Sequence, residues 1–306
     1  MNEPRGPLIS VIMNCYNSDR FLKEAIESVL AQTYPHWEII FWDNQSTDSS
    51  REIIQSFQDP RIKYFLAPTF TPLGHARNLA VNQAKGEWIA FLDCDDIWLS
   101  EKLEKQVQII ASESPNLGLV YSRALIKGDK YTGTEYAPQY LGKALPEGEI
   151  LQDYLLGDNF IPLVSALIKR TVFHEVGGIP EHYKQSEDFY IFAAVAAKYL
   201  VGVEQSVTCL YRVHANNLSH HQKELACEES ISVIEKFWND TKDPESKRHQ
   251  KDNMLRRLHV LAGLYMIRSR RNMGLGLQRV RKDPILATSM VLSYVFKGNR
   301  NLILDA

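Results

Sequence analysis

The sequence predicts an α/β fold built around a mostly parallel, doubly wound sheet. From residue 8 to about residue 110, short apolar runs alternate with amphipathic segments, which is the order of strands and helices in such folds. Polar clusters follow three of the apolar runs, at residues 14–17, 43–48 and 93–96. Ligands of doubly wound sheets bind at the carboxyl ends of the strands. The three clusters therefore predict one site at one edge of the sheet.

The first half of the chain gives the clearest elements. Strands are predicted over residues 8–13, 38–42, 61–66 and 88–92, where branched and aromatic residues are concentrated. Amphipathic helices are predicted over residues 19–32, after residue 48 with residues 53, 54 and 57 inward, over residues 75–84, and after the cap Ser100 with residues 103, 107 and 110 in register. Pro35 and Gly86 stand just past the first and third of these helices, where such residues commonly end a helix.

The second half is less regular. Strands are predicted over residues 118–127, 162–169 and 206–213, and helices over residues 170–176 and 186–199. Residues 128–148 are rich in Gly, Pro and Tyr and predict a long loop or a short hairpin. Residues 224–297 predict three helices. We therefore expect a domain over residues 1–222, with halves 1–115 and 116–222, followed by a helical extension over residues 223–306.

The charge of the chain is unevenly distributed. Residues 1–240 hold 21 Lys and Arg against 32 Asp and Glu, whereas residues 241–306 hold 14 against 5. The acidic part suits an enzyme that uses a metal ion. The basic tail suggests an anionic partner, with a membrane surface or a phosphorylated carrier favoured over nucleic acid. The alternatives for the tail are a helical cap with a solvated basic face and a contact between the subunits of a homodimer.

The cysteines and the apolar stretches indicate a cytoplasmic protein. The four cysteines are far apart and lack the spacing of a zinc or redox motif, which predicts reduced thiols. The N-terminus has no apolar signal region. The apolar stretches at residues 258–267 and 285–296 are too short to span a bilayer. We expect at most a peripheral contact with the inner face of the membrane.

An apolar run over residues 88–92 leads directly into three acids, Asp93, Asp95 and Asp96. Like charges at this distance repel, and burying even one of them is costly. A divalent cation is the simplest group that would compensate them, because hard cations bind carboxylates and often share them with phosphates. The alternative is a solvated turn with a helix cap.

Eight short stretches together resemble the family-2 glycosyltransferases, which use nucleotide-activated sugars. They lie in the family's order at residues 10–17, 28–35, 43–48, 76–78, 86–96, 176–178, 187–188 and 211–214. The resemblance covers residues 8–220 and implies the GT-A fold, a Rossmann-like α/β fold. The chain departs from the family's pattern around Asp43, where Trp42, Asn44 and Gln45 replace an aliphatic residue, a second acid and a glycine.

The resemblance implies a set of residues that bind the nucleotide-sugar donor. Tyr16 is placed to stack on the base, and Asp43 to accept a hydrogen bond from a ring N–H. This N–H is a feature of uracil and thymine, so UDP-sugars or their thymidine analogues are favoured, and UDP is expected over dTDP or GDP. Arg77 is placed to reach a phosphate or to hold Asp93, which is expected on the ribose. Surface packing, a turn and an exposed helix arginine are the alternatives for Tyr16, Asp43 and Arg77. The donor-binding set is Asn14, Tyr16, Asn17, Asp43, Arg77, Asp93 and Asp95.

The resemblance also implies a metal and a catalytic base. Asp95 and His214 are the expected ligands of Mn²⁺ or Mg²⁺, which would offset charge on the leaving diphosphate, and Asp96 is expected to cap or orient. Asp188 is the expected general base of a single inverting displacement, with Glu187 beside it on the acceptor side. The alternative is that the last two acids only favour a helix N-terminus.

The function implied is a metal-dependent inverting glycosyltransferase of the hexosyl- or N-acetylhexosaminyl-transferase class. It would move a sugar from a UDP-type donor to a saccharide or lipid-linked saccharide, as in surface polysaccharide biosynthesis. A second hypothesis is a non-catalytic nucleotide-sugar-binding subunit of a membrane-associated assembly complex. A processive synthase is disfavoured because the chain lacks transmembrane segments and a Gln-x-x-Arg-Trp sequence. A nicotinamide-dependent dehydrogenase is disfavoured because no glycine-rich turn follows the first strand.

Overall fold

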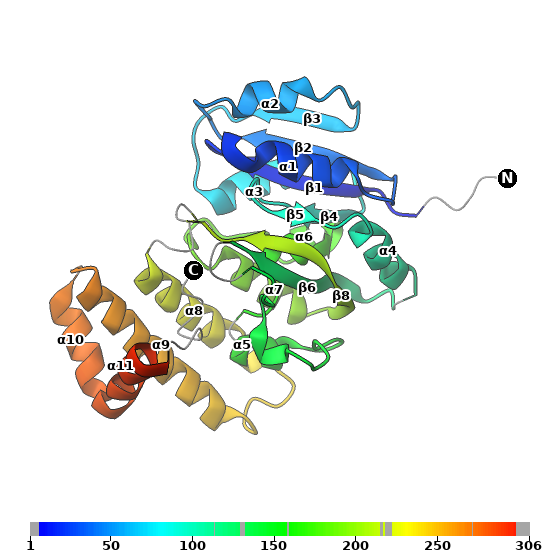
Figure 1. Ribbon diagram of the computed structural model, residues 1–306. Coiled ribbons are helices and arrows are strands. Elements are labelled where there is room, and N and C mark those ends of the chain that lie inside the picture. Colours follow the sequence, from blue (N-terminus) through cyan, green and yellow to red (C-terminus); the bar gives the residue numbers. More distant parts are fainter. Residues whose placement is uncertain are drawn as a thin grey trace.

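The computed structural model describes residues 6–112, 114–128, 132–157, 159–214, 217, 222–270 and 272–297, with side chains to residue 291. Within these residues, eight strands form one sheet that has helices on both faces (Figure 1). The strands are β1 (Ile9–Cys15), β2 (Trp37–Asp43), β3 (Ile62–Leu66), β4 (Trp88–Phe91), β5 (Ile97–Trp98), β6 (Leu117–Lys127), β7 (Leu167–Lys169) and β8 (Leu200–Arg212).

The sheet confirms the predicted α/β class but contains more antiparallel pairing than its first half suggests. The strand order is β3-β2-β1-β4-β7-β6-β8-β5. Strands β1 to β4 run parallel to one another, and β6 runs parallel to β8. Strand β7 is antiparallel to both of its neighbours, and β5 is antiparallel to β8. Residues 162–166 of the predicted strand do not extend β7, because residues 163–165 form a 3₁₀ turn.

Register brings the polar clusters together. Strand β1 aligns with β2 so that Cys15 lies opposite Asp43, and it aligns with β4 so that Ile12 lies opposite Phe91. The three strands run in the same direction, so their carboxyl ends meet at one edge of the sheet. The predicted juxtaposition of residues 14–17, 43–48 and 93–96 is therefore confirmed.

The helices follow the predicted order, with additions. Residues 151–156 form a helix that was not predicted, and the tail forms α8 to α11 in its described part where three helices were predicted. Asp283 separates the last two of them: its carboxylate accepts from the backbone N–H of Leu286, and Pro284 begins the next helix. The helices are α1 (Asp19–Leu30), α2 (Ser50–Ser56), α3 (Leu73–Val81), α4 (Lys102–Ser112), α5 (Leu151–Leu156), α6 (Arg170–Glu175), α7 (Glu187–Ala196), α8 (Lys223–Phe237), α9 (Arg248–Arg268), α10 (Met273–Lys282) and α11 (Pro284–Lys297).

The core has two hydrophobic clusters, one on each face of the sheet. Side chains alternate along β1, so that Val11 and Met13 join the cluster under α1 while Ile12 joins the cluster under α3 and α7. Helices α8 and α9 belong to the second cluster together with α7. The tail therefore shares its core with the helix that carries the predicted base. No helix in the described ranges has both the length and the apolar character that crossing a bilayer requires.

Helices α9 and α10 cross at two glycines. A β-carbon added to Gly276 would lie 2.8 Å from the carbonyl oxygen of Gly263, and one added to Gly263 would lie 2.9 Å from that of Gly276. Both neighbours are backbone atoms, so the helices would have to separate to admit a methyl group.

We expect Gly276→Ala to destabilise the protein by about 1–3 kcal/mol, because overpacking a close contact costs about that much. The measurement is thermal unfolding. Gly274→Ala on the same helix is the matched control, since nothing lies within 4 Å of the added β-carbon. The control is expected to stabilise the helix by about 0.5–1 kcal/mol. Equal melting temperatures for the two variants would contradict the close crossing.

Candidate active site at the strand ends

The three acids after β4 have different environments. Asp96 is buried, and its Oδ1 accepts a 2.7 Å hydrogen bond from the backbone N–H of Arg212 on β8. Burial raises the pKa of Asp96 well above its ordinary value, and the charges of Asp95 and Asp93 raise it further. This carboxyl therefore serves to fasten the acidic turn to β8, in agreement with the orienting role predicted for it.

Asp95 lies against His214. The Oδ2 atom of Asp95 and Nε2 of His214 are 2.9 Å apart, although the two residues are 119 positions apart in the sequence. Burial, and then the charge of Asp93, raise the pKa of Asp95, while His214 opposes the rise. Arg212 supports the turn, because its Nε donates a 2.6 Å hydrogen bond to the carbonyl oxygen of Asp95. Its position in the 211–214 motif was the only sequence signal for Arg212.

Arg77 lies at the centre of the site. It is 4% exposed, which excludes the exposed-arginine alternative. Its Nη2 donates to Asp93 Oδ1 at 2.9 Å, and its Nη1 donates to Glu187 Oε1 at 3.2 Å. Glu187 is also buried, and burial raises its pKa to about 7 although Arg77 opposes the rise. One guanidinium thus joins the acidic end of β4 to the first residue of α7.

Asp188 follows on the first turn of α7. Its Oδ1 accepts from the backbone N–H of Phe189 at 2.7 Å, and its Oδ2 accepts from Nδ2 of Asn159 at 3.0 Å. Asn159 in turn accepts from the hydroxyl of Tyr154 at 2.5 Å. Burial raises the pKa of Asp188, and the hydrogen bond from Asn159 is the largest opposing influence.

The residues that orient Asp188 were missed at the sequence level. Tyr154 lies on α5, a helix of six residues that is too short to show a period, and Asn159 follows it with a positive φ of 48°. An asparagine with positive φ is common in turns. No sequence pattern therefore marked either residue.

The opposite end of the site carries an exposed aromatic pair. Tyr16, after β1, is 52% exposed, and Phe70, in the loop before α3, is 59% exposed. Their ring centroids are 4.8 Å apart in an edge-on arrangement. Asn44 holds the loop of Phe70, because its Nδ2 donates to the carbonyl oxygen of Thr71 at 2.7 Å. Asn44, which departs from the family's pattern, therefore fixes the loop that carries Phe70. Phe70 itself was not predicted as a site residue.

Asp43 has a different environment from the predicted one. Its side chain is fully buried, and its oxygens accept from the backbone N–H of Ser46 and from the hydroxyl of Tyr64, each at 2.8 Å. In this conformation Asp43 presents no surface to a ligand and shapes the turn after β2 instead. The turn alternative that was left open for Asp43 describes this geometry.

The two asparagines after β1 differ in their pairing. Asn17 accepts from the backbone N–H of Thr47 at 2.8 Å and so joins the first two polar clusters. Asn14 has a buried amide nitrogen that finds no hydrogen-bond partner within the described residues. Such a donor is expensive to leave unpaired. Asn14 Nδ2 is therefore an unpaired donor at the end of β1, and a ligand could reach it only if neighbouring atoms move.

The acids are not gathered into a ready-made metal cage. Among the residues that the structure describes, no group of three or more His, Cys, Asp or Glu side chains is placed to hold a metal ion. Asp95 nevertheless offers a carboxylate oxygen, a ligand that suits Mn²⁺ or Mg²⁺, and the imidazole nitrogen of His214 lies beside it. A metal with few protein ligands is usual where phosphates complete the coordination.

The sequence over residues 10–177 matches the model of glycosyl transferase family 2. The chain belongs to this family. It is 32% identical over 189 residues to WfgD of Escherichia coli, named as a UDP-Glc:alpha-D-GlcNAc-diphosphoundecaprenol beta-1,3-glucosyltransferase, covering 61% of this chain and 69% of WfgD. It is 31% identical over 230 residues to WfaP of Escherichia coli, which carries the same activity name, covering 73% of this chain and 85% of WfaP. The chain is accordingly a glycosyltransferase.

Solved structures share the fold of this family-2 chain. Staphylococcus aureus TarS in complex with UDP-GlcNAc superposes with a TM-score of 0.61 at 17% identity, covering 94% of this chain and 91% of TarS. The mannosyltransferase PcManGT from Pyrobaculum calidifontis, in complex with GDP-Man and Mn²⁺, superposes with a TM-score of 0.65 at 18% identity, covering 96% and 82%. At these identities the likeness establishes the fold, which is the GT-A fold that was predicted.

Proposed function

We propose that this glycosyltransferase moves a sugar from a UDP-type donor to a lipid-linked saccharide, with inversion at the anomeric carbon and Asp188 as the base. The observation that carries the proposal is the double contact of Arg77 with Asp93 and Glu187. This contact places the acidic strand end, where a nucleotide diphosphate would lie, beside the helix start that carries Asp188. A base must lie within reach of the acceptor hydroxyl as it attacks.

The nucleotide end supports a donor bound across the strand ends. Tyr16 has an exposed ring on which a base can stack, and Phe70 stands beside it. Asn14 has an unpaired but buried amide nitrogen at the same strand end. WfgD and WfaP are named as acting on UDP-Glc, which favours uridine over thymidine or guanosine. Direct contact of Asp43 with the base stays a prediction that requires its side chain to turn outward.

Mn²⁺ or Mg²⁺ is the proposed cofactor, and Asp95 and His214 are the residues that would hold it. When bound, the ion would neutralise charge on the leaving diphosphate. The chain's own residues keep the two ligands in place: Arg212 donates to the Asp95 backbone, and the ring of Phe21 lies 5.2 Å from that of His214. PcManGT was solved with Mn²⁺ and GDP-Man, which favours a metal in a protein of this fold.

We expect the wild-type protein to bind UDP more tightly in Mn²⁺ than in chelator. Asp95→Asn should reduce this metal-dependent affinity for UDP at least about tenfold, because the loss of even an outer-shell partner of a metal site reduces metal affinity by about that factor. Isothermal titration with UDP, in Mn²⁺ or in chelator, measures the loss. Asp59→Asn is the matched control, because that carboxylate pairs with Arg61 outside the site. Metal-dependent binding that survives in Asp95→Asn would refute the ligand role, and absence of UDP binding by the wild type would refute the donor assignment.

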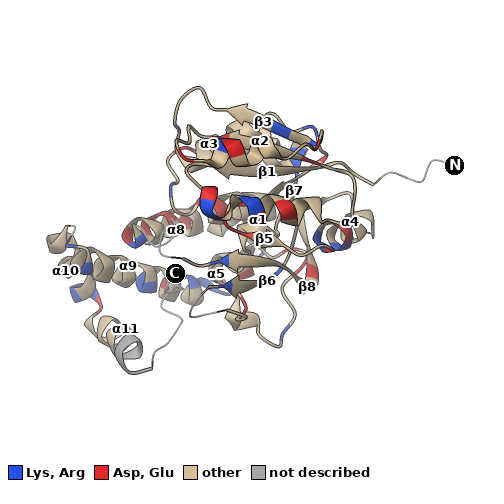
Figure 2. Ribbon diagram, turned by 45° about the horizontal axis from the view of Figure 1, so that its top comes forward, with Lys and Arg blue, Asp and Glu red and all other residues tan. Residues whose placement is uncertain are grey.

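The acceptor proposed is a saccharide on a lipid diphosphate, since WfgD and WfaP are named for diphosphoundecaprenol-linked GlcNAc. We place the enzyme in the cytoplasm, at the inner face of the membrane, in surface polysaccharide biosynthesis. Lys and Arg residues are frequent along α9 and α10, where the ribbon of Figure 2 is blue in several places. Exposed apolar side chains accompany them on α10 and α11, namely Met273, Leu277, Ile285 and Val291. Mixed basic and apolar surfaces favour contact with anionic lipid.

We expect the protein to sediment with phosphatidylglycerol vesicles at low salt and to stay free of phosphatidylcholine vesicles. Ile285→Ser should weaken this binding about tenfold, because burying such a side chain contributes about 1.5–3 kcal/mol. Leu141→Ser is the matched control, since Leu141 is 69% exposed but lies outside the tail. Arg271, one of the basic residues of the tail, lies outside the described residues. Equal binding to both vesicle types would exclude the membrane proposal.

A catalytic role is proposed over the alternative of a non-catalytic binding subunit. WfgD, WfaP and PcManGT are all named as transferases, which favours a catalytic role over a silent nucleotide-sugar-binding subunit. The domain boundary at residues 222 and 223 and the homodimer contact stay proposals. Size-exclusion chromatography with light scattering would decide the second.

A further inference from the structure

Helix α8 reaches the loop that leads into the catalytic acids. Glu229 on this helix is 7% exposed. Its Oε1 accepts from the backbone N–H of Lys184, and its Oε2 accepts from those of Gln185 and Ser186, each at 2.9 Å. The next two residues of the chain are Glu187 and Asp188. One buried carboxylate thus accepts from three consecutive backbone donors directly before Glu187 and Asp188.

In this arrangement the three backbone N–H groups and the Glu229 carboxylate are hydrogen-bond partners, and each would be costly to bury unpaired. Backbone N–H groups buried without an acceptor cost free energy, and so does a buried carboxylate without donors. Ser186 is the N-cap of α7, yet its side chain makes no capping hydrogen bond to that helix. The start of α7 therefore depends on a carboxylate from another helix, whose negative charge also suits a helix N-terminus.

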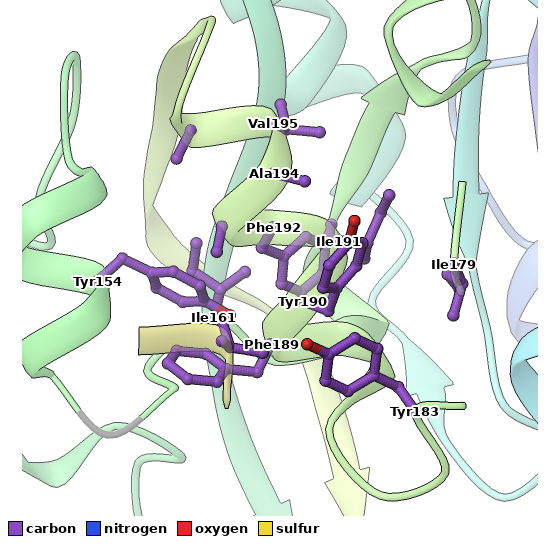
Figure 3. Close-up of a cluster of buried hydrophobic side chains, with 14 of the residues drawn as sticks. Tyr154, Ile161, Ile179, Tyr183, Phe189, Tyr190, Ile191, Phe192, Ala194 and Val195 are labelled. Carbon is purple, nitrogen blue, oxygen red and sulfur yellow. The ribbon is translucent and has the colours of Figure 1, made fainter. Parts of the chain in front are cut away.

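Packing holds α8 at a fixed position against α7. The hydroxyl of Ser186 donates to the carbonyl oxygen of Ala226 at 3.2 Å, and the hydroxyls of Tyr183 and Ser232 are 3.2 Å apart. Figure 3 shows Tyr183 beside Tyr190 in the buried cluster around α7, and their ring centroids are 4.8 Å apart. The ring of Tyr190 in turn packs against that of Phe237 on α8, with ring centroids 5.5 Å apart. A movement of α8 would therefore displace the start of α7.

We propose that Glu229 is a positioning residue through which the C-terminal helices align Asp188 for catalysis. This inference rests on the proposed role of Asp188 as the base. Without the carboxylate, the 184–186 loop loses its anchor, and the hydrogen bond between Asp188 and Asn159 loses its fixed geometry. The helical tail is then a working part of the active site as well as a surface for partners.

The test compares Glu229→Gln and Glu229→Ala with Glu228→Gln. A glutamine keeps one acceptor oxygen and can still bind Gln185 and Ser186, whereas alanine binds none of the three donors. We expect kcat for sugar transfer, or for hydrolysis of UDP-glucose, to fall about tenfold in the first variant and about 10²-fold in the second. The donor KM and the affinity for UDP should stay unchanged. Glu228 pairs with Arg279 at 3.0 Å on another helix, so its variant should keep the wild-type kcat.

The outcomes separate the alternatives. A graded loss of kcat at constant donor KM, in variants that melt cooperatively, supports a positioning role. Wild-type kcat in both folded Glu229 variants overturns it, as does an equal fall of kcat and UDP affinity, which would indicate a general structural role. If Glu229→Ala fails to fold, Glu229→Gln alone decides. Failure of the proposed function is distinguishable, because the wild type itself would then neither bind UDP nor turn over UDP-glucose.

Discussion

Replacing Asp188 with asparagine is expected to lower kcat by about 10²–10⁴-fold, the usual contribution of a general base. Asparagine keeps the size of the side chain and an acceptor for the amide of Asn159, so the fold and the donor site should survive. The measurement is sugar transfer from UDP-glucose, with UDP affinity determined in parallel. Asp153→Asn is the matched control, because Asp153 is a surface acid paired with Lys247 at 3.1 Å. The control should keep full activity.

The pH dependence gives a second check on the same residue. A base acts only when it is deprotonated, and burial raises the pKa of Asp188. We therefore expect kcat/KM to fall as the pH is lowered through a range above the ordinary aspartate value of about 3.9. Full turnover by Asp188→Asn, or an activity that is flat down to that value, would show that another group takes the proton.

Replacing Arg77 with methionine is expected to cost about 3–5 kcal/mol of unfolding free energy at a pH above the pKa of Glu187, because there it leaves a buried charge uncompensated. Glu187 is the charge concerned, since its side chain is 7% exposed, whereas that of Asp93 is 38% exposed and is better screened by water. UDP binding should weaken as well, because Asp93 loses its anchor. Urea unfolding measures the first effect and titration with UDP the second.

The double variant Arg77→Met, Glu187→Gln tests whether the uncompensated charge of Glu187 causes this loss of stability. Removing the carboxylate should restore part of the lost stability if the uncompensated charge is responsible. In the single variant, stability should also recover at acid pH. The pKa of Glu187 is raised to about 7 in the folded wild type, against about 4.3 for a free glutamate, and Arg77 opposes the rise. Between these values the folded state keeps a proton that the unfolded state has lost, so this group's contribution declines as the pH rises through the window. A loss that is independent of pH and unchanged by Glu187→Gln would contradict this account.

The sequence by itself determined the class of the fold and the family. Alternating apolar runs and amphipathic segments place strands and helices in order, and the order of short motifs identifies the family. The antiparallel direction of β7 could not be predicted from the sequence, because an apolar run of three residues does not indicate which strands will pair with it. Helix α5 and strand β5 were not predicted, because each is too short to show a periodic pattern of apolar residues.

The tertiary structure alone decided which polar groups remain available. Asp43 and Tyr16 both follow a strand in the sequence, yet packing buries the first and exposes the second. Arg77 meets Glu187 from a distance of 110 positions along the chain, and Glu229 meets the loop before Asp188 from another helix. Burial and partners fix the charge state and the orientation of a side chain, and both depend on segments far apart in the sequence. Residue types could therefore predict the acids, while only the folded chain shows what holds them in position.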